Sequence, residues 1–238
     1  METIVFFISL ILLFLFFMFW YQPLIKLWPQ DRNITAKIIL GILPAFFLIL
    51  IIFILIFITY PDIINNLNKI AFYIVLGYVW ILTGFILTTL CFDLHWTDDV
   101  IHLNNRAALP AITGEFIVIT FIYAGANAGN TPAWWAVLFR GLIGLAAWLT
   151  LGWIAHLCTG VFERITVERD TSCGYRLCLY LLLCGGILGY ACSGDWISFS
   201  MTITKFIASW PALPLTVLYI IIELIINYKT KKQGKENQ

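Results

Sequence analysis

The chain has 238 residues, of which 61% are hydrophobic and only 11% are charged. A soluble globular protein has about 45–50% apolar and about 25% charged residues, so this chain lacks the polar residues needed to cover a water-soluble fold. Its mean hydropathy of +0.93 indicates an integral membrane protein. A net charge of only +1 gives no electrostatic signal for binding to nucleic acid.

Seven apolar stretches are long enough, or nearly long enough, to cross a bilayer, which needs about 20 helical residues. None alternates residue by residue as the strands of an outer-membrane barrel do, so we predict an all-α, polytopic fold with seven transmembrane helices. The first stretch has no basic n-region and no small-residue cleavage site, which favours a retained span over a signal peptide. The seven stretches are Ile4–Trp20, Ile38–Thr59, Ile70–Cys91, Ala107–Ala124, Trp134–Cys158, Leu177–Ala191 and Pro211–Tyr228.

Lysine and arginine residues divide unequally between the two sets of loops that seven spans create. Eleven lie on one side, two (Lys69 and Lys205) lie on the other, and Arg140 lies within a span. Because short loops rich in Lys and Arg stay in the cytoplasm, we predict a multi-pass protein of the bacterial inner (plasma) membrane. Its N-terminus is expected outside and its C-terminus in the cytoplasm. The eleven are Lys26, Arg32, Lys37, Arg106, Arg164, Arg169, Arg176, Lys229, Lys231, Lys232 and Lys235.

The helices predicted to start near Ala107 and Thr171 share a pattern that indicates an internal repeat. Asn105 and Asp170 are N-cap residue types that precede small residues, and both helices end on a Tyr-Ala pair. Both units start on the same side, so they would be parallel repeats, each a two-helix hairpin. Chance similarity of two apolar hairpins is the alternative. The predicted division is a two-helix extension (1–66), a leading helix and cytoplasmic loop (67–106), a first repeat (107–170), a second repeat (171–228) and a disordered basic tail (229–238).

The stretch from Ala71 to Trp196 resembles the YjfL-like bacterial inner-membrane proteins. That family has one leading helix and two copies of a two-helix domain of unknown function. The resemblance rests on the helix starts at 104–108 and 170–174, on the stretch 185–187 and on the region around His95. It implies a compact helical protein of the inner membrane and implies no reaction.

Glu115 and Arg140 are ionisable residues inside the predicted fourth and fifth spans. An intramembrane charge costs about 2.5–3.5 kcal/mol on insertion scales, so the presence of each residue needs a structural or functional reason. At a rise of about 1.5 Å per residue, each lies about 12 Å from its own interface. Their depths would then differ by only about 6 Å in a core about 30 Å thick. We predict a buried ion pair near the midplane; the alternative is two charges that line a polar pathway separately.

The segment 93–102 holds the densest group of potential metal ligands in the chain. Carboxylates and imidazoles can bind a divalent ion, and Asp98 and His102 would share one helical face at i, i+4. The spacing matches no strong zinc motif, so a solvated loop that caps the next helix is the alternative. The candidate ligands are Asp93, His95, Asp98, Asp99 and His102.

The remaining signals concern packing more than chemistry. Gly185 and Gly189 form a Gly-X-X-X-Gly pattern, which predicts a close helix contact within the chain or between two copies. Glu223, in the last predicted span, is expected to snorkel or to hydrogen-bond without a specific function. There is no Walker A motif, no nucleophile elbow and no long soluble segment, so we predict no enzyme and no cofactor.

The function that fits these signals is a membrane scaffold or a channel- or transport-type subunit. One alternative is an intramembrane metal-dependent enzyme that uses the segment 93–102, and another is an anchor for a cytoplasmic partner. The expected partners are the lipid bilayer and a second copy of the chain, and not nucleic acid. The sequence does not identify a cytoplasmic partner.

Overall fold

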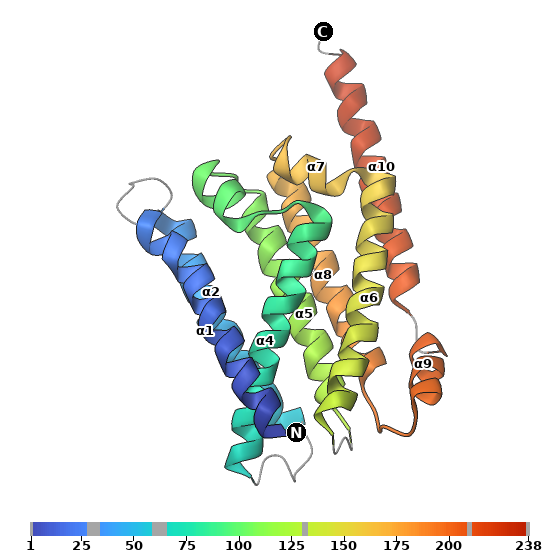
Figure 1. Ribbon diagram of the computed structural model, residues 1–238. Coiled ribbons are helices and arrows are strands. Elements are labelled where there is room, and N and C mark those ends of the chain that lie inside the picture. The colour runs from blue at the N-terminus through green and yellow to red at the C-terminus, as the bar shows by residue number, and fades with distance from the viewer. Residues whose placement is uncertain (1, 28–33, 59–65, 130–132, 209–210, 237–238) are drawn as a thin grey trace.

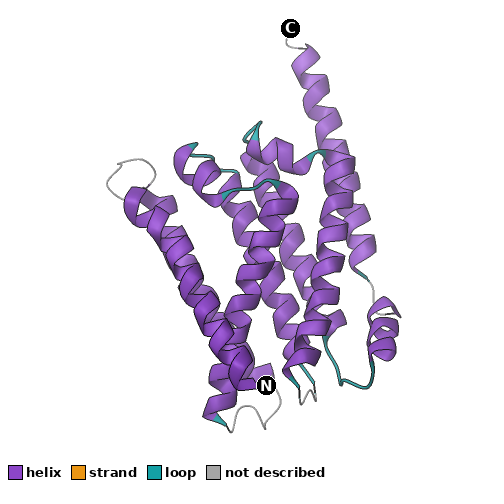
Figure 2. Ribbon diagram, in the orientation of Figure 1, coloured by secondary structure: helices purple, strands orange, loops and turns teal. Residues whose placement is uncertain are grey.

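A computed structural model describes residues 2–27, 34–58, 66–129, 133–208 and 211–236. Within these ranges every regular element is a helix and no strand is present (Figure 2). In the described part of the chain seven helices are long and apolar enough to cross a membrane, which confirms the predicted all-α, seven-span fold. They are α1 (Glu2–Leu27), α2 (Ile34–Ile58), α4 (Leu67–Phe92), α5 (Ala108–Asn127), α6 (Trp134–Thr159), α8 (Thr171–Cys192) and α10 (Ala212–Glu236).

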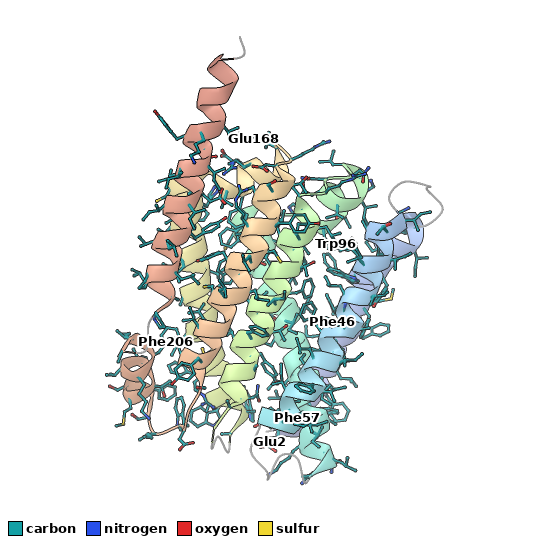
Figure 3. The ribbon with its side chains drawn as sticks, turned by 180° about the vertical axis from the view of Figure 1, so that it is seen from behind. Glu2, Phe46, Phe57, Trp96, Glu168 and Phe206 are labelled. Carbon is teal, nitrogen blue, oxygen red and sulfur yellow. The ribbon has the colours of Figure 1, made fainter. Side chains whose placement is uncertain are left out.

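Three short helices lie near the ends of the seven long ones (Figure 1). The π-helical segment η1 (Trp96–His102) and α7 (Val161–Thr166) lie at the end where α10 finishes, which we name the α7 end. Helix α9 (Phe199–Ala208) lies toward the opposite end, the α9 end, where α1 begins. Figure 3 shows the same division, with Trp96 and Glu168 near the α7 end and Glu2 and Phe57 near the other.

Helix α5 is the centre of the bundle. Sixteen of its 20 residues are buried, and it packs against α2, α4, α6, α8 and η1. A helix that is apolar all round belongs in a core, where no face has to meet solvent or lipid. Helices α1 and α10 instead keep most of their apolar side chains exposed, as expected of helices that face lipid.

Helices α5 and α8 share the most extensive contact in the bundle, and glycines make it close. A Cβ atom on Gly125 would collide with the backbone of Gly189, and one on Gly174 would collide with the carbonyl of Ala107. Only glycine lets two backbones approach this closely. The close approach increases the dispersion contact between the helices, which matters because the hydrophobic effect does not drive helix association in lipid. The two helices therefore act as one unit in the middle of the protein.

Aromatic side chains join α1, α2 and α4 by hydrogen bonds to backbone carbonyls. Pro44 in α2 has no N–H, so the carbonyl of Leu40 loses its normal partner in the helix. Trp20 Nε1 in α1 donates to that carbonyl at 3.0 Å, and Tyr78 Oη in α4 donates to the Pro44 carbonyl at 2.5 Å. Such bonds are needed because the membrane interior offers no water to backbone groups.

The structure corrects four expectations from the sequence. The segment 93–102 is not a solvated loop, since seven of its residues form η1 and Val100 is fully buried. The second unit is not a simple hairpin, because α9 lies between α8 and α10. The tail expected to be disordered from Lys229 is helical through Glu236, since α10 continues without a break.

The fourth correction concerns Asn105, which does not cap α5 as an N-cap residue. The helix begins at Ala108, and Asn105 instead donates to the Ile165 carbonyl at 2.6 Å and accepts from the Ala107 amide at 3.0 Å. Asn105 therefore connects the start of α5 with α7. The parallel-repeat relation between the two units stays a prediction.

Candidate functional site

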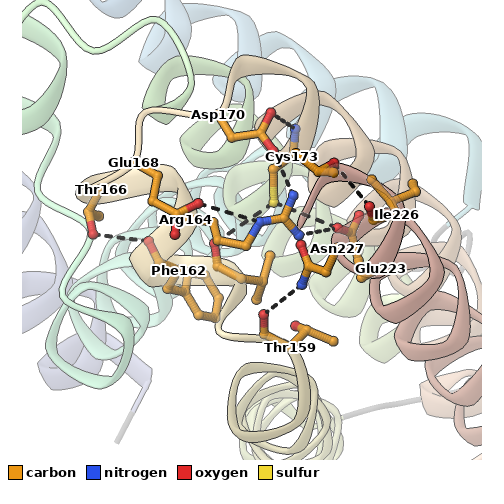
Figure 4. Close-up of polar contacts among 12 residues, drawn as sticks. Thr159, Phe162, Arg164, Thr166, Glu168, Asp170, Cys173, Glu223, Ile226 and Asn227 are labelled. Atoms are coloured by element: carbon orange, nitrogen blue, oxygen red, sulfur yellow. Dashed lines mark hydrogen bonds and ion pairs between the residues drawn. The ribbon is translucent and has the colours of Figure 1, made fainter. Parts of the chain in front are cut away.

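Four charged side chains meet at the α7 end in what we name the α7-end ion cluster (Figure 4). Arg164 comes from α7, Asp170 from the residue before α8, Arg176 from α8 and Glu223 from α10. Segments up to 59 residues apart in the chain are thereby joined through charged groups.

Local geometry explains how the cluster forms. Gly160 ends α6 with a left-handed φ of 63°, which turns the chain so that α7 follows directly. Asp170 is the N-cap of α8, as the sequence predicts, and its Oδ1 accepts from the Cys173 amide at 3.0 Å. Its other oxygen, Oδ2, lies 2.6 Å from Nη2 of Arg164. One carboxylate thus caps one helix and binds the arginine of another.

Glu223 is the deepest member of the α7-end ion cluster and is fully buried. Arg164 Nη1 lies 2.6 Å from Glu223 Oε2, and Arg176 approaches with Nε 2.5 Å from Oε1 and Nη2 3.0 Å from Oε2. Two parallel N–H donors on one carboxylate make the strong bidentate geometry of an arginine fork. A buried carboxylate is tolerable here because both of its oxygens are engaged by cations.

The α7-end ion cluster holds two arginines and two carboxylates, and the exposed carboxylate of Glu168 lies 4.0 Å from Arg164 Nε at its edge. Burial opposes ionisation of Asp170, but the Cys173 amide and the Arg164 guanidinium outweigh it and hold the pKa of that carboxyl below its usual value. Mutually hydrogen-bonded charges of this kind join the helices that carry them.

Arg140 lies in the second turn of α6, near the α9 end. Its Nη1 donates to the Gly194 carbonyl and, at 3.4 Å, to the Ala128 carbonyl. Ala128 and Gly194 lie just beyond the ends of α5 and α8, and the amide of Gly194 also donates to the Ala128 carbonyl at 3.0 Å. Arg140 therefore extends toward the α9 end and holds the ends of the two central helices together.

Glu115 is buried, as the sequence predicts for a core charge, but the structure does not bring it to Arg140. Its hydrogen-bonding neighbour among the described residues is Thr88, whose hydroxyl oxygen lies 3.3 Å from Oε2. The similar depths of the two Cα atoms do not bring the charged groups together, because each group lies at the end of a long side chain. The long arginine side chain instead points along the helix axis to the carbonyls at the α9 end. The ion pair predicted from the sequence is not formed.

The candidate metal ligands in 93–102 do not converge. Within the described residues no group of three or more His, Cys, Asp or Glu side chains is placed to hold a metal ion, so the predicted metal site is not assembled. Asp98 and His102 are exposed on η1, and His95 Nε2 lies 3.3 Å from Asp93 at the surface. Asp99 is buried and accepts from the His95 amide at 2.8 Å. Burial raises the pKa of the Asp99 carboxyl, although this amide opposes the shift.

Gly185 and Gly189 lie on the face of α8 that meets α5. A Cβ atom on Gly185 would lie 2.8 Å from the Val118 Cα, and one on Gly189 would lie 2.5 Å from the Phe121 carbonyl oxygen. The contact is within one chain, which is one of the two alternatives left open by the sequence.

Sequence reasoning missed the α7-end ion cluster. In the sequence, Arg164 and Arg176 serve only to show which loops are cytoplasmic. No partner is predicted for Glu223. A usable signal was present, because a carboxylate in an apolar span indicates a cation nearby, and Arg164 and Arg176 flank the neighbouring span on the same side. Comparison of the chain with protein-family models, curated proteins and solved structures finds no match in any of the three.

Proposed function

We propose that the chain is a membrane-embedded scaffold, a multi-pass protein of the bacterial inner (plasma) membrane. The observation that supports this role is the α7-end ion cluster. Its charges bind one another across α7, α8 and α10, which stabilises one arrangement of these helices. Arg140 supports the same role at the other end, where it holds the ends of α5 and α8. The resemblance to the YjfL-like proteins agrees with this location.

The orientation we propose places the α7 end in the cytoplasm. Eleven of the 14 lysines and arginines belong to that side, whereas Lys69 and Lys205 belong to the α9 side. Reporter fusions after Gln238 and beside Asn68 should therefore respond to opposite compartments, with the Gln238 fusion cytoplasmic. Fusions that report the same compartment would contradict the seven-span topology.

The scaffold role is tested by two measurements on the purified protein. The mass of the detergent-solubilised assembly should be a fixed multiple of the chain, which also tests the proposal that a second copy is a partner. Reconstituted liposomes should pass ions and small solutes no faster than protein-free liposomes. Selective flux that scales with the amount of protein would overturn the scaffold proposal.

A channel- or transport-type subunit is the second candidate, and one observation favours it. Glu115 is a fully buried carboxyl on the central helix whose Oε1 has no hydrogen-bond partner within the described residues. Polar groups of this kind inside membrane bundles are costly and commonly belong to ion or proton pathways. Flux that is lost in Glu115→Gln and retained in Glu163→Gln would favour this candidate.

A further inference from the structure

Glu115 occupies a position that neither helix packing nor the ion cluster explains. It lies on α5, seven residues after the start of the helix, and its side chain has no exposed surface. In the described part of the chain its Oε1 has no hydrogen-bond partner. A carboxylate has about four acceptor sites, so its contacts should reveal whether the group is ionised.

The contacts of Thr88 in α4 point to a neutral acid. Thr88 Oγ1 lies 2.9 Å from the carbonyl oxygen of Phe85 and 3.3 Å from Glu115 Oε2. A hydroxyl has one hydrogen to donate and two lone pairs that accept. If the shorter contact takes the Thr88 hydrogen, the contact with Glu115 is a hydrogen bond only when Glu115 supplies the proton. If Glu115 were ionised, the Thr88 hydroxyl would be the one hydrogen-bond donor that the described residues offer to its two oxygens.

No cation compensates a charge at this position. Among the described residues no lysine, arginine or histidine forms an ion pair with Glu115, and Thr88 is its one hydrogen-bonding neighbour. In the described part of the chain, none of the titratable or charged groups on the helices packed against α5 forms an ion pair or a hydrogen bond with Glu115. They are Lys37 on α2, Lys69, Tyr73, Tyr78 and Cys91 on α4, Asp98, Asp99 and His102 on η1, Arg140, His156 and Cys158 on α6, and Cys173, Tyr175, Arg176, Cys178, Tyr180, Cys184, Tyr190 and Cys192 on α8.

Phe116, the residue that follows Glu115, lies in an aromatic and apolar cluster. The ring of Phe116 stacks on Phe85 with centroids 4.7 Å apart and on Phe47 at 5.2 Å, and Trp20 packs against it edge-on at 5.5 Å. All four rings are at most 1% exposed. Glu115 itself has no exposed surface, and an ionised carboxylate that is buried without a partner is far more costly than the neutral acid.

We propose that Glu115 and Thr88 form a proton-binding site in the centre of the bundle. Glu115 is a neutral carboxylic acid in the folded protein at neutral pH, and it donates its hydrogen bond to Thr88 Oγ1. The ligand of the site is the proton itself, and its loss would place an uncompensated negative charge on the central helix. This inference does not rest on the scaffold role, because it concerns the state of one group and is measured without any flux.

The first test uses dicyclohexylcarbodiimide, an apolar reagent that reacts with protonated carboxyls in apolar surroundings. The acid O–H adds across one C=N bond, and the product rearranges to a stable N-acylurea without loss of any atom. Mass spectrometry of peptides from the treated protein should find this adduct on Glu115 at neutral pH. The adduct should diminish as the pH is raised until Glu115 ionises, and it should be absent in Glu115→Gln.

Glu223 is the matched control within the same chain. It is equally buried on another membrane helix, α10, but two arginines form ion pairs with it. It should therefore remain unmodified under conditions that modify Glu115. Modification of Glu223 with Glu115 unmodified would reverse the assignment and overturn the proposal.

Infrared spectroscopy gives a second test that does not depend on access of a reagent. The difference spectrum of wild type minus Glu115→Gln should contain the C=O stretch of a protonated carboxyl. Thr88→Val keeps Glu115 in place and should move that band to higher frequency, because the hydrogen bond is lost; this variant serves if Glu115→Gln does not fold. Carboxylate bands in place of the C=O band at neutral pH, or a band unaffected by Thr88→Val, would overturn the proposal.

Discussion

Replacing Glu223 by Gln tests whether the α7-end ion cluster stabilises the fold. The change keeps the size and shape of the side chain but removes the charge that Arg164 and Arg176 share. Both guanidinium groups then lose their deepest counter-charge, whereas Arg164 keeps Asp170 at 2.6 Å. We expect a marked loss of stability with little change in the overall fold.

The size of the loss follows from the contacts of Glu223. Its two oxygens accept three charge-assisted hydrogen bonds, at 2.5, 2.6 and 3.0 Å. Removing one partner from a buried pair costs about 3–5 kcal/mol. The side chains of Arg164 and Arg176 are 10% and 25% exposed, so water recovers part of that cost and the lower bound of about 3 kcal/mol applies. For a chain of this size, that loss corresponds to a decrease in Tm of about 6–12 °C.

The assay is thermal unfolding of the detergent-solubilised protein, followed by circular dichroism and by loss of the monodisperse peak in size-exclusion chromatography. Glu163→Gln is the control, since Glu163 is an exposed residue of α7, and it should change stability by no more than about 0.5 kcal/mol. Adding Arg176→Gln to Glu223→Gln should recover part of the loss, because the remaining Arg164 and Asp170 balance each other. Equal Tm values for Glu223→Gln and Glu163→Gln would show that the ion cluster does not stabilise the fold. A decrease in Tm in the double variant equal to the sum of the two single decreases would show that Glu223 and Arg176 are not coupled.

Three further predictions concern other parts of the bundle. Gly189→Ala should destabilise the protein by about 1–3 kcal/mol, because the added Cβ atom would lie 2.5 Å from the backbone of α5. Gly186→Ala is the control and should be neutral or slightly stabilising, because nothing lies within 4 Å of its added Cβ atom. Equal effects of the two substitutions in thermal unfolding would contradict the close contact of α8 with α5. The pKa of Asp170 is lowered in the folded state, so its contribution is present at neutral pH and is lost as the pH falls through that lowered value. Asp170→Asn should therefore lower the free energy of unfolding at neutral pH and reduce its dependence on pH in the acid range. Curves of unfolding free energy against pH that run parallel in the variant and the wild type would contradict this prediction. Within the described residues Glu115 and Arg140 bind different groups, so the effects of Glu115→Gln and Arg140→Gln on Tm should add. Recovery of Tm in the double variant would instead indicate an ion pair between the two residues.

The sequence by itself determined the features that depend on composition and on local geometry. The seven spans follow from apolar length, since a bilayer core requires about 20 helical residues and the chain provides seven such stretches. Asp170 caps α8 as predicted, because an N-cap bond joins residues only three apart in the chain. The Gly-X-X-X-Gly pattern of α8 is likewise visible in the sequence, although its partner helix is not.

Only the tertiary structure decided which charges meet. Glu115 and Arg140 lie at similar calculated depths, yet one meets a threonine of α4 and the other meets carbonyls beyond the ends of α5 and α8. Glu223 finds Arg164 at a separation of 59 residues, because α10 packs beside α8 and α7 follows from the turn at Gly160.

The physical reason is that the pattern of apolar residues fixes the length and number of helices but neither their neighbours nor their rotation. In a bundle where every long helix is apolar on most faces, hydrophobic periodicity does not distinguish one face from another. The choice is made by close glycine contacts and by the cost of leaving a polar group without a partner in the membrane. Both depend on pairs of residues that are distant in the sequence, so they are determined only when the helices are assembled.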